Sequence, residues 1–134
     1  MMNTVSLACA ILLSAHCVAV ARDIGQWDEA TPIEVRQWYA RQMVKENPHV
    51  SCCGEADAYW ADKHVVKDGV VFVIITDNRP DGPLRRPHIE VGTLIEVPAN
   101  RFNDSRRDPN PTGHNVVFIN HQRNLVLCFV DSSG

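Results

Sequence analysis

The sequence lacks any block of basic residues long enough to bind a nucleic acid. Its formal net charge is −3, its pI is about 6.0, and lysine is scarce beside arginine. Because nucleic-acid binding depends on clustered positive charge, this composition excludes nucleic acid as a partner. Beyond its first residues the chain also lacks a hydrophobic run of bilayer length, so we expect no membrane span in the mature form.

Catalytic motifs are missing too. The chain contains no C-x-x-C and no G-x-S-x-G, and it shows no internal repeat or low-complexity linker. These absences favour a small non-enzymatic module with a structural or binding role and no cofactor. The sequence does not identify the ligand of this module. We expect its partner to be an envelope component or another protein.

The alternative is a periplasmic protein that handles thiols or metal ions such as copper or zinc. The chain has soft and borderline ligands for these ions, but no two of them stand at C-x₂-C or H-x₃-H spacing. The metal hypothesis is therefore weak, and its candidate ligands are Cys52, Cys53, His64 and His114, with Cys128 as a further thiol.

The first residues predict export. Residues 1–21 contain no Asp, Glu, Lys or Arg and include two apolar runs. Small residues at Ala19 and Ala21, followed by the charged Arg22, form the A-x-A pattern that signal peptidase accepts. We therefore expect a cleavable signal peptide over residues 1–21 and a single domain over residues 22–134, located in the periplasm or secreted.

One helix is predicted near the start of this domain. Thr31 is a suitable cap, Pro32 suits the first helical position, and Glu34 completes a capping box. An apolar stripe follows on one helical face, which carries Val35, Trp38, Tyr39 and Met43. We expect the helix to end near Glu46, because Asn47 precedes a proline and residues before proline avoid the helical region.

From Ala58 onward the pattern is typical of strands. Asp68-Gly69 between residues 59–66 and 70–75 predicts a hairpin whose second strand is central and buried on both faces. Further strands are expected at residues 93–97, 115–119 and 125–130. The fold class is therefore α+β, with one N-terminal helix packed on a small, mostly antiparallel curved sheet or open barrel of about five strands.

The mature domain would keep three cysteines, because Cys9 and Cys17 lie in the expected signal peptide. In an oxidising compartment, Cys52 or Cys53 is expected to form a disulfide with Cys128 and to tie the two ends of the domain together. The sequence leaves open which of the two pairs. Three is an odd number, so one thiol is left over.

Three segments carry a resemblance: residues 51–59 around the double cysteine, residues 110–114, and residues 127–130 around Cys128. Over residues 27–134 the chain resembles a family of short exported alphaproteobacterial (rhizobia-like) proteins with a Cys-Cys pair and a C-terminal Cys. The resemblance implies a Gram-negative periplasm and brings no activity with it. Some members carry a further cysteine where this chain has Ala58, which accounts for the odd count.

The two long loops of the domain are rich in arginine. Guanidinium groups bind carboxylates and phosphates through two parallel hydrogen bonds, so these loops are candidates for an anion-binding face. The acidic pair Glu55 and Asp57 is interpreted as a solvated turn. The candidate anion-binding residues are Arg79, Arg85, Arg86, Arg101, Arg106 and Arg107.

Overall fold

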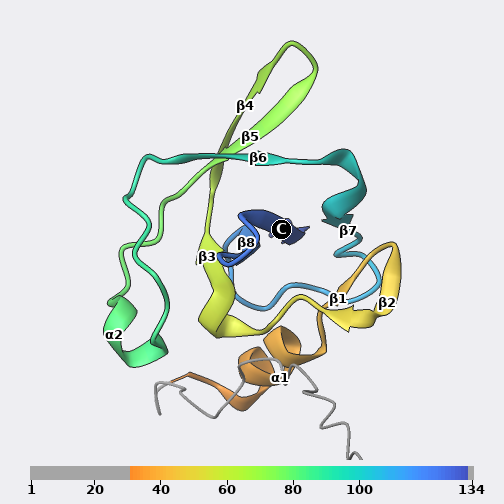
Figure 1. Ribbon diagram of the computed structural model, residues 1–134. Helices are drawn as coiled ribbons and strands as arrows, with labels where there is room; N and C mark the ends of the chain where they lie inside the picture. Colours follow the sequence, from red (N-terminus) through yellow and green to blue (C-terminus); the bar gives the residue numbers. More distant parts are fainter. Residues whose placement is uncertain (1–30, 133–134) are drawn as a thin grey trace, which may run out of the picture.

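The computed structural model describes residues 31–132 of the chain. The expected signal peptide over residues 1–21 lies outside the described residues. Figure 1 shows short strands in several directions, with helix α1 (Ile33–Arg41) covering one side and a long hairpin projecting from the other. The second α-helix, α2 (Asp81–Leu84), is a single turn, and two 3₁₀ turns are η1 (Glu55–Asp57) and η2 (Ala99–Arg101).

Nine strands form three sheets within the described residues. A two-stranded sheet pairs β1 (Met43–Val44) with β2 (Asn47–Ser51). The central sheet has the order β3 (Ala58–Trp60), β8 (Val116–Asn120), β9 (Leu125–Val130), β7 (Phe102–Asn103). The outer sheet has the order β4 (Lys63–Lys67), β5 (Val70–Ile74), β6 (Leu94–Val97).

The central sheet is buried on both faces. Its strands β8 and β9 read as continuous apolar runs, and nearly every residue in them is inaccessible to solvent. On one face, Phe118 packs with Trp38 and Tyr39 of α1. On the other, Val117 packs with Val73 of the outer sheet. A strand covered on both sides needs no polar alternation, which explains why these runs are uninterrupted.

The predicted fold class is wrong. The chain is mostly β, with three sheets, one substantial helix and, over residues 31–132, no closed barrel. The physical reason is that consecutive strands do not all pair within one sheet. β3 pairs with β8, far along the chain, whereas β4 pairs locally with β5. The polypeptide therefore leaves the central sheet after Trp60 and starts the outer sheet at Lys63.

The helix also differs from its prediction at both ends. It begins at Ile33 with Pro32 before it and has no side-chain cap, so Thr31 does not cap it. It ends at Arg41 instead of near Glu46. Gln42 is extended and buried, and its amide nitrogen donates to the Trp38 carbonyl and to Asp108 Oδ2.

The predicted hairpin turn is confirmed, but its predicted first strand over residues 59–66 is divided between β3 and β4. Lys67 pairs with Val70, and Asp68 and Gly69 between them both have positive φ, as a two-residue primed turn requires. β5 is the central strand of its sheet, but its predicted burial on both faces is wrong. Of its residues, only Val73 is fully buried. The predicted hairpin across residues 120–124 is also confirmed by the pairing of β8 with β9.

A disulfide joins Cys52 to Cys128. Cys52 directly follows β2, and Cys128 lies in β9, so the bond attaches the β1–β2 hairpin to the central sheet. Both cysteines are fully buried in the cluster beside α1. Among the described residues, Cys53 is the free cysteine.

Candidate ligand pocket

A pocket of about 380 Å³ opens between α1 and the edge of the central sheet. One part of its wall is polar and aromatic, and the other part is apolar. The α1 side contributes the start of the helix, while η1, β3 and the loops after β5 and before β8 contribute the rest. The lining residues are Thr31, Pro32, Val35, Tyr39, Glu55, Trp60, Arg79, Pro111 and Thr112.

Asp77 organises the polar wall. Its carboxylate accepts hydrogen bonds from Arg79, from Arg86 and from the backbone N–H of Trp60, at 2.7 to 3.1 Å. Burial alone raises the pKa of Asp77, but the two guanidinium groups outweigh it and hold the pKa well below its usual range. The Asp77 carboxylate is therefore ionised and fully buried among its partners.

Arg86 fixes the loop that follows. It is buried and donates to Asp77, to Asp81 and to the carbonyl of Ala58. Its guanidinium also lies 4.6 Å from the ring centroid of Tyr59, a cation–π contact. Arg86 therefore connects the segment 77–86 to β3, and this connection holds the backbone that carries Arg79.

Glu55 is the unusual member of the cluster. Its Oε1 accepts a 2.8 Å hydrogen bond from Arg79, but its Oε2 is buried and has no hydrogen-bond partner among the described residues. The residue is only 6% exposed. Burial raises the pKa of Glu55, and Arg79 only partly offsets this effect. Leaving a buried carboxylate oxygen without a donor costs free energy.

Trp60 lies between two groups. The Arg79 guanidinium lies 4.0 Å from the indole centroid, and the His114 ring stacks on the indole at 3.7 Å with a 10° tilt. Asp62 holds His114 in turn through a 2.8 Å contact with Nδ1. Both faces of the indole are covered, and it enters the pocket only with its edge.

Tyr39 of α1 also lines the pocket. It is 1% exposed, and its pKa is raised to about 12, chiefly by burial. Its hydroxyl therefore stays protonated at neutral pH and acts as a neutral polar group. The connected ion pairs join four carboxylates to two guanidinium groups and one imidazole: Glu55, Asp77, Asp81 and Glu90 with Arg79, Arg86 and His88. The excess is negative, which favours a cationic or hydrogen-donating ligand group.

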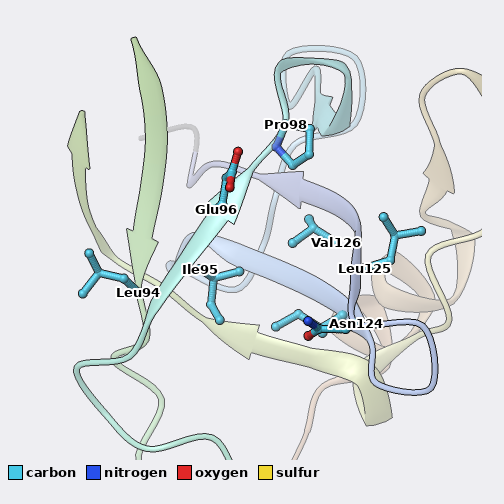
Figure 2. Close-up of a pocket in the computed structure, with 8 residues that line it drawn as sticks. Leu94, Ile95, Glu96, Pro98, Asn124, Leu125 and Val126 are labelled. Carbon is cyan, nitrogen blue, oxygen red and sulfur yellow. The ribbon is translucent and has the colours of Figure 1, made fainter. Parts of the chain in front are cut away.

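A second pocket of about 450 Å³ lies between β6 and the β8–β9 hairpin. Figure 2 shows Ile95 of β6 and Val126 of β9 on opposite sides of it, while Leu94 points away. Its walls mix polar and apolar side chains, and no ion pair joins the residues that line it. The pocket beside α1 is therefore the stronger candidate site.

The structure separates the predicted metal ligands. Cys52 is in the disulfide, Cys53 is half-buried beside it, His64 lies on the projecting hairpin and His114 is paired with Asp62. Over residues 31–132, no three His, Cys, Asp or Glu side chains converge to hold a metal ion. Burial, with a smaller contribution from Asp57, raises the pKa of the Cys53 thiol, which lowers its reactivity.

The predicted anion-binding arginines do not gather at one place. Arg79 and Arg86 belong to the buried ion-pair cluster, and Arg106 pairs with Asp104 at the surface. Arg85 follows α2, whereas Arg101 and Arg107 lie on either side of β7. The anion-binding face stays a hypothesis.

Sequence reasoning names Arg79 as a candidate binding residue but misses the roles of Glu55 and Asp77 beside it. It interprets Glu55 as part of a solvated turn, yet this residue is buried. A signal does exist for Asp77, since it stands two residues before Arg79 in an Asp-x-Arg segment, and side chains at this spacing in a loop can pair locally. No local pattern connects Glu55 with Arg79, because the contact spans 24 residues.

Comparison with protein families, with curated proteins and with solved structures finds no match for this chain. No helix in the described part of the chain is long and apolar enough to cross a membrane.

Proposed function

We propose that the protein is an exported, disulfide-bonded, non-enzymatic module that binds a small cationic ligand in the pocket beside α1. In this proposal, the cationic group donates a hydrogen bond to Oε2 of Glu55. The ligand class is a primary amine with a short apolar part.

The observation that carries the proposal is the unpartnered oxygen of Glu55. Charge-assisted hydrogen bonds to a carboxylate are about twice as strong as neutral ones, so an ammonium group would gain most from this atom. The net negative charge of the cluster acts in the same direction. A carboxylate ligand would instead be repelled by Glu55, while Arg79 is already engaged by Asp77 and Glu55.

The remaining walls fit the apolar part of such a ligand. Pro32, Val35 and Pro111 contribute hydrocarbon to the lining of the same pocket as Glu55. A volume of about 380 Å³ is at the small end of the range for ligand sites in proteins. It suits an alkylamine and excludes a polymer segment of several units.

Export is the second part of the proposal. It is supported by the uncharged apolar start of the chain and its A-x-A pattern. The buried disulfide is compatible with an oxidising compartment.

The test is a titration of the purified protein with butylammonium, followed by ¹H–¹⁵N NMR. Butanol and butyrate serve as neutral and anionic probes of the same length. We expect butylammonium alone to shift the Trp60 indole resonance, because the indole edge lines the pocket. Glu55→Gln should weaken binding by about tenfold or more, since it replaces a charge-assisted bond by a neutral one.

Glu34→Gln is the matched control. Glu34 lies in the first turn of α1, next to the pocket residue Val35, but is exposed. It should bind butylammonium like the wild type. Equal binding of butanol and butylammonium, or unchanged binding by Glu55→Gln, would contradict the proposal. Binding should also weaken as pH falls through the raised pKa of Glu55, because the protonated acid no longer attracts the cation.

A further inference from the structure

One face of the outer sheet is apolar and lies away from both buried clusters. The strand register places Val65 beside Phe72 and Ile74 beside Leu94 on this face. Val70, two residues from Phe72 along β5, lies on the same face. Val65 is 37% and Leu94 48% exposed, and the three β5 residues are partly exposed.

The opposite face accounts for the attachment of this sheet to the body. It carries Val73, Ile95 and Val97, which pack into the cluster with the central sheet. Phe72 and Ile74 belong to neither cluster. In Figure 1 the β4–β5 hairpin extends away from the rest of the molecule.

Charges border this face asymmetrically. Lys63 and Lys67 lie on β4 at one edge, and Glu96 lies on β6 at the other. Glu96 shares a row with Val65 and Phe72, whereas the two lysines stand one row before and one row after. All three charged side chains are exposed. The face is therefore an apolar strip with a basic edge and an acidic edge.

We propose that this face is the interface of a homodimer, formed by packing of the outer sheet against the same sheet of a second copy. A two-fold axis parallel to the strands brings β4 of each copy opposite β6 of the other. Glu96 then lies opposite Val65 of the partner copy, between its Lys63 and Lys67. The apolar residues of β5, which are Val70, Phe72 and Ile74, meet the same residues of the partner copy across about 10 Å, the usual spacing of packed sheets.

A second copy fits because the pattern complements itself. An isologous interface needs one surface that carries both halves of each contact, and the basic and acidic edges supply them. Edge-to-edge pairing is the competing mode of sheet association. Lysines on the β4 edge disfavour it, which leaves the face as the surface for association.

The test uses charge reversal and mixing, with sedimentation velocity from about 1 µM to about 1 mM protein. The wild type should be dimeric toward the upper end of this concentration range. K63E/K67E places acidic groups opposite the partner's Glu96, and E96K places basic groups opposite the partner's lysines. Each variant alone should be monomeric at every concentration. Mixed in equal amounts, the two variants should form a heterodimer. The new acidic groups of K63E/K67E then face the new lysine of E96K, and the unchanged Glu96 of the first variant faces the unchanged Lys63 and Lys67 of the second.

K45E and E46K are matched controls. Lys45 and Glu46 lie exposed in the turn between β1 and β2, on a different sheet. Both controls should dimerise like the wild type, and circular dichroism should show that every variant is folded. A wild type that is monomeric throughout overturns the proposal. So does a dimer that persists in both reversed variants, or the absence of a heterodimer in the mixture.

Discussion

The side chain of Asp77 joins three separate parts of the structure through one buried carboxylate. One carboxylate receives donors from β3, from its own loop and from Arg86 beyond α2. Breaking such a buried network by removing one partner costs about 3–5 kcal/mol, because the other charges remain buried and unpaired. The arrangement holds Arg79 and Glu55 in place for the pocket.

Asp77→Asn should therefore lower the free energy of unfolding by about 3 kcal/mol or more at neutral pH. The amide keeps the shape of the carboxylate but removes the buried charge that Arg79 and Arg86 share, and leaves them only their pairs with Glu55 and Asp81. Urea denaturation of both proteins measures the difference. Asp104→Asn is the control, since Asp104 forms a solvent-exposed pair with Arg106 and its loss should change little.

The pH dependence gives a second readout of the same substitution. The folded-state pKa of Asp77 is depressed, so its contribution is fully present above the unfolded value of about 3.9 and is lost as pH falls below it. The wild type should therefore lose stability steeply below about pH 4. The Asp77→Asn variant should show a shallower acid limb, and parallel acid limbs would mean that other carboxylates dominate.

At the scale of single elements, the sequence predicts what local chemistry controls. The turn at Asp68-Gly69 is set by two adjacent residues, and the hairpin lies where it is expected. The predicted end of α1 is wrong because Gln42 bonds to Asp108, which is 66 residues away. No pattern near residue 42 contains that information.

The turn offers a clean test of this local control. Gly69 has a φ of 78°, and no atom lies within 4 Å of the position that a Cβ would take, so a methyl group there meets backbone strain and no clash. Gly69→Ala should cost about 1–2 kcal/mol of unfolding free energy. Gly82 in α2 also has open space but no positive φ. Gly82→Ala should be neutral or stabilising, and equal losses in the two variants would refute the strain argument.

At the scale of the whole molecule, sequence reasoning finds most strands but not their distribution among sheets. The pairing of β3 with β8 and the parallel pairing of β7 with β9 connect distant segments. Continuous apolar runs at residues 70–75 and 116–119 look alike in sequence, yet only the second is covered on both faces. Burial depends on what packs against a strand, which a local pattern cannot specify.

The disulfide shows the same limit. The sequence predicts a bond to Cys128 but does not choose its partner. Both cysteines lie after the end of β2 and Cys53 has a positive φ, so the alternation of side chains along a strand does not by itself select the bonded cysteine. The backbone N–H of Cys52 donates to the Gln42 carbonyl, while Cys53 has a φ of 80° and stays half-buried. This non-local contact decides that Cys52 pairs.

Loss of this bond should therefore have a large effect, and loss of the neighbouring thiol a small one. The cysteines are 76 residues apart, and freeing a loop of that length increases the entropy of the unfolded chain, which lowers stability by about 4 kcal/mol. A Cys52→Ala/Cys128→Ala variant should show that loss in urea denaturation, whereas Cys53→Ser should stay close to the wild type. If Cys53→Ser instead lost as much stability, or if reductant did not destabilise it, Cys53 would be the bonded cysteine. The β1–β2 hairpin would then have a different attachment to the central sheet.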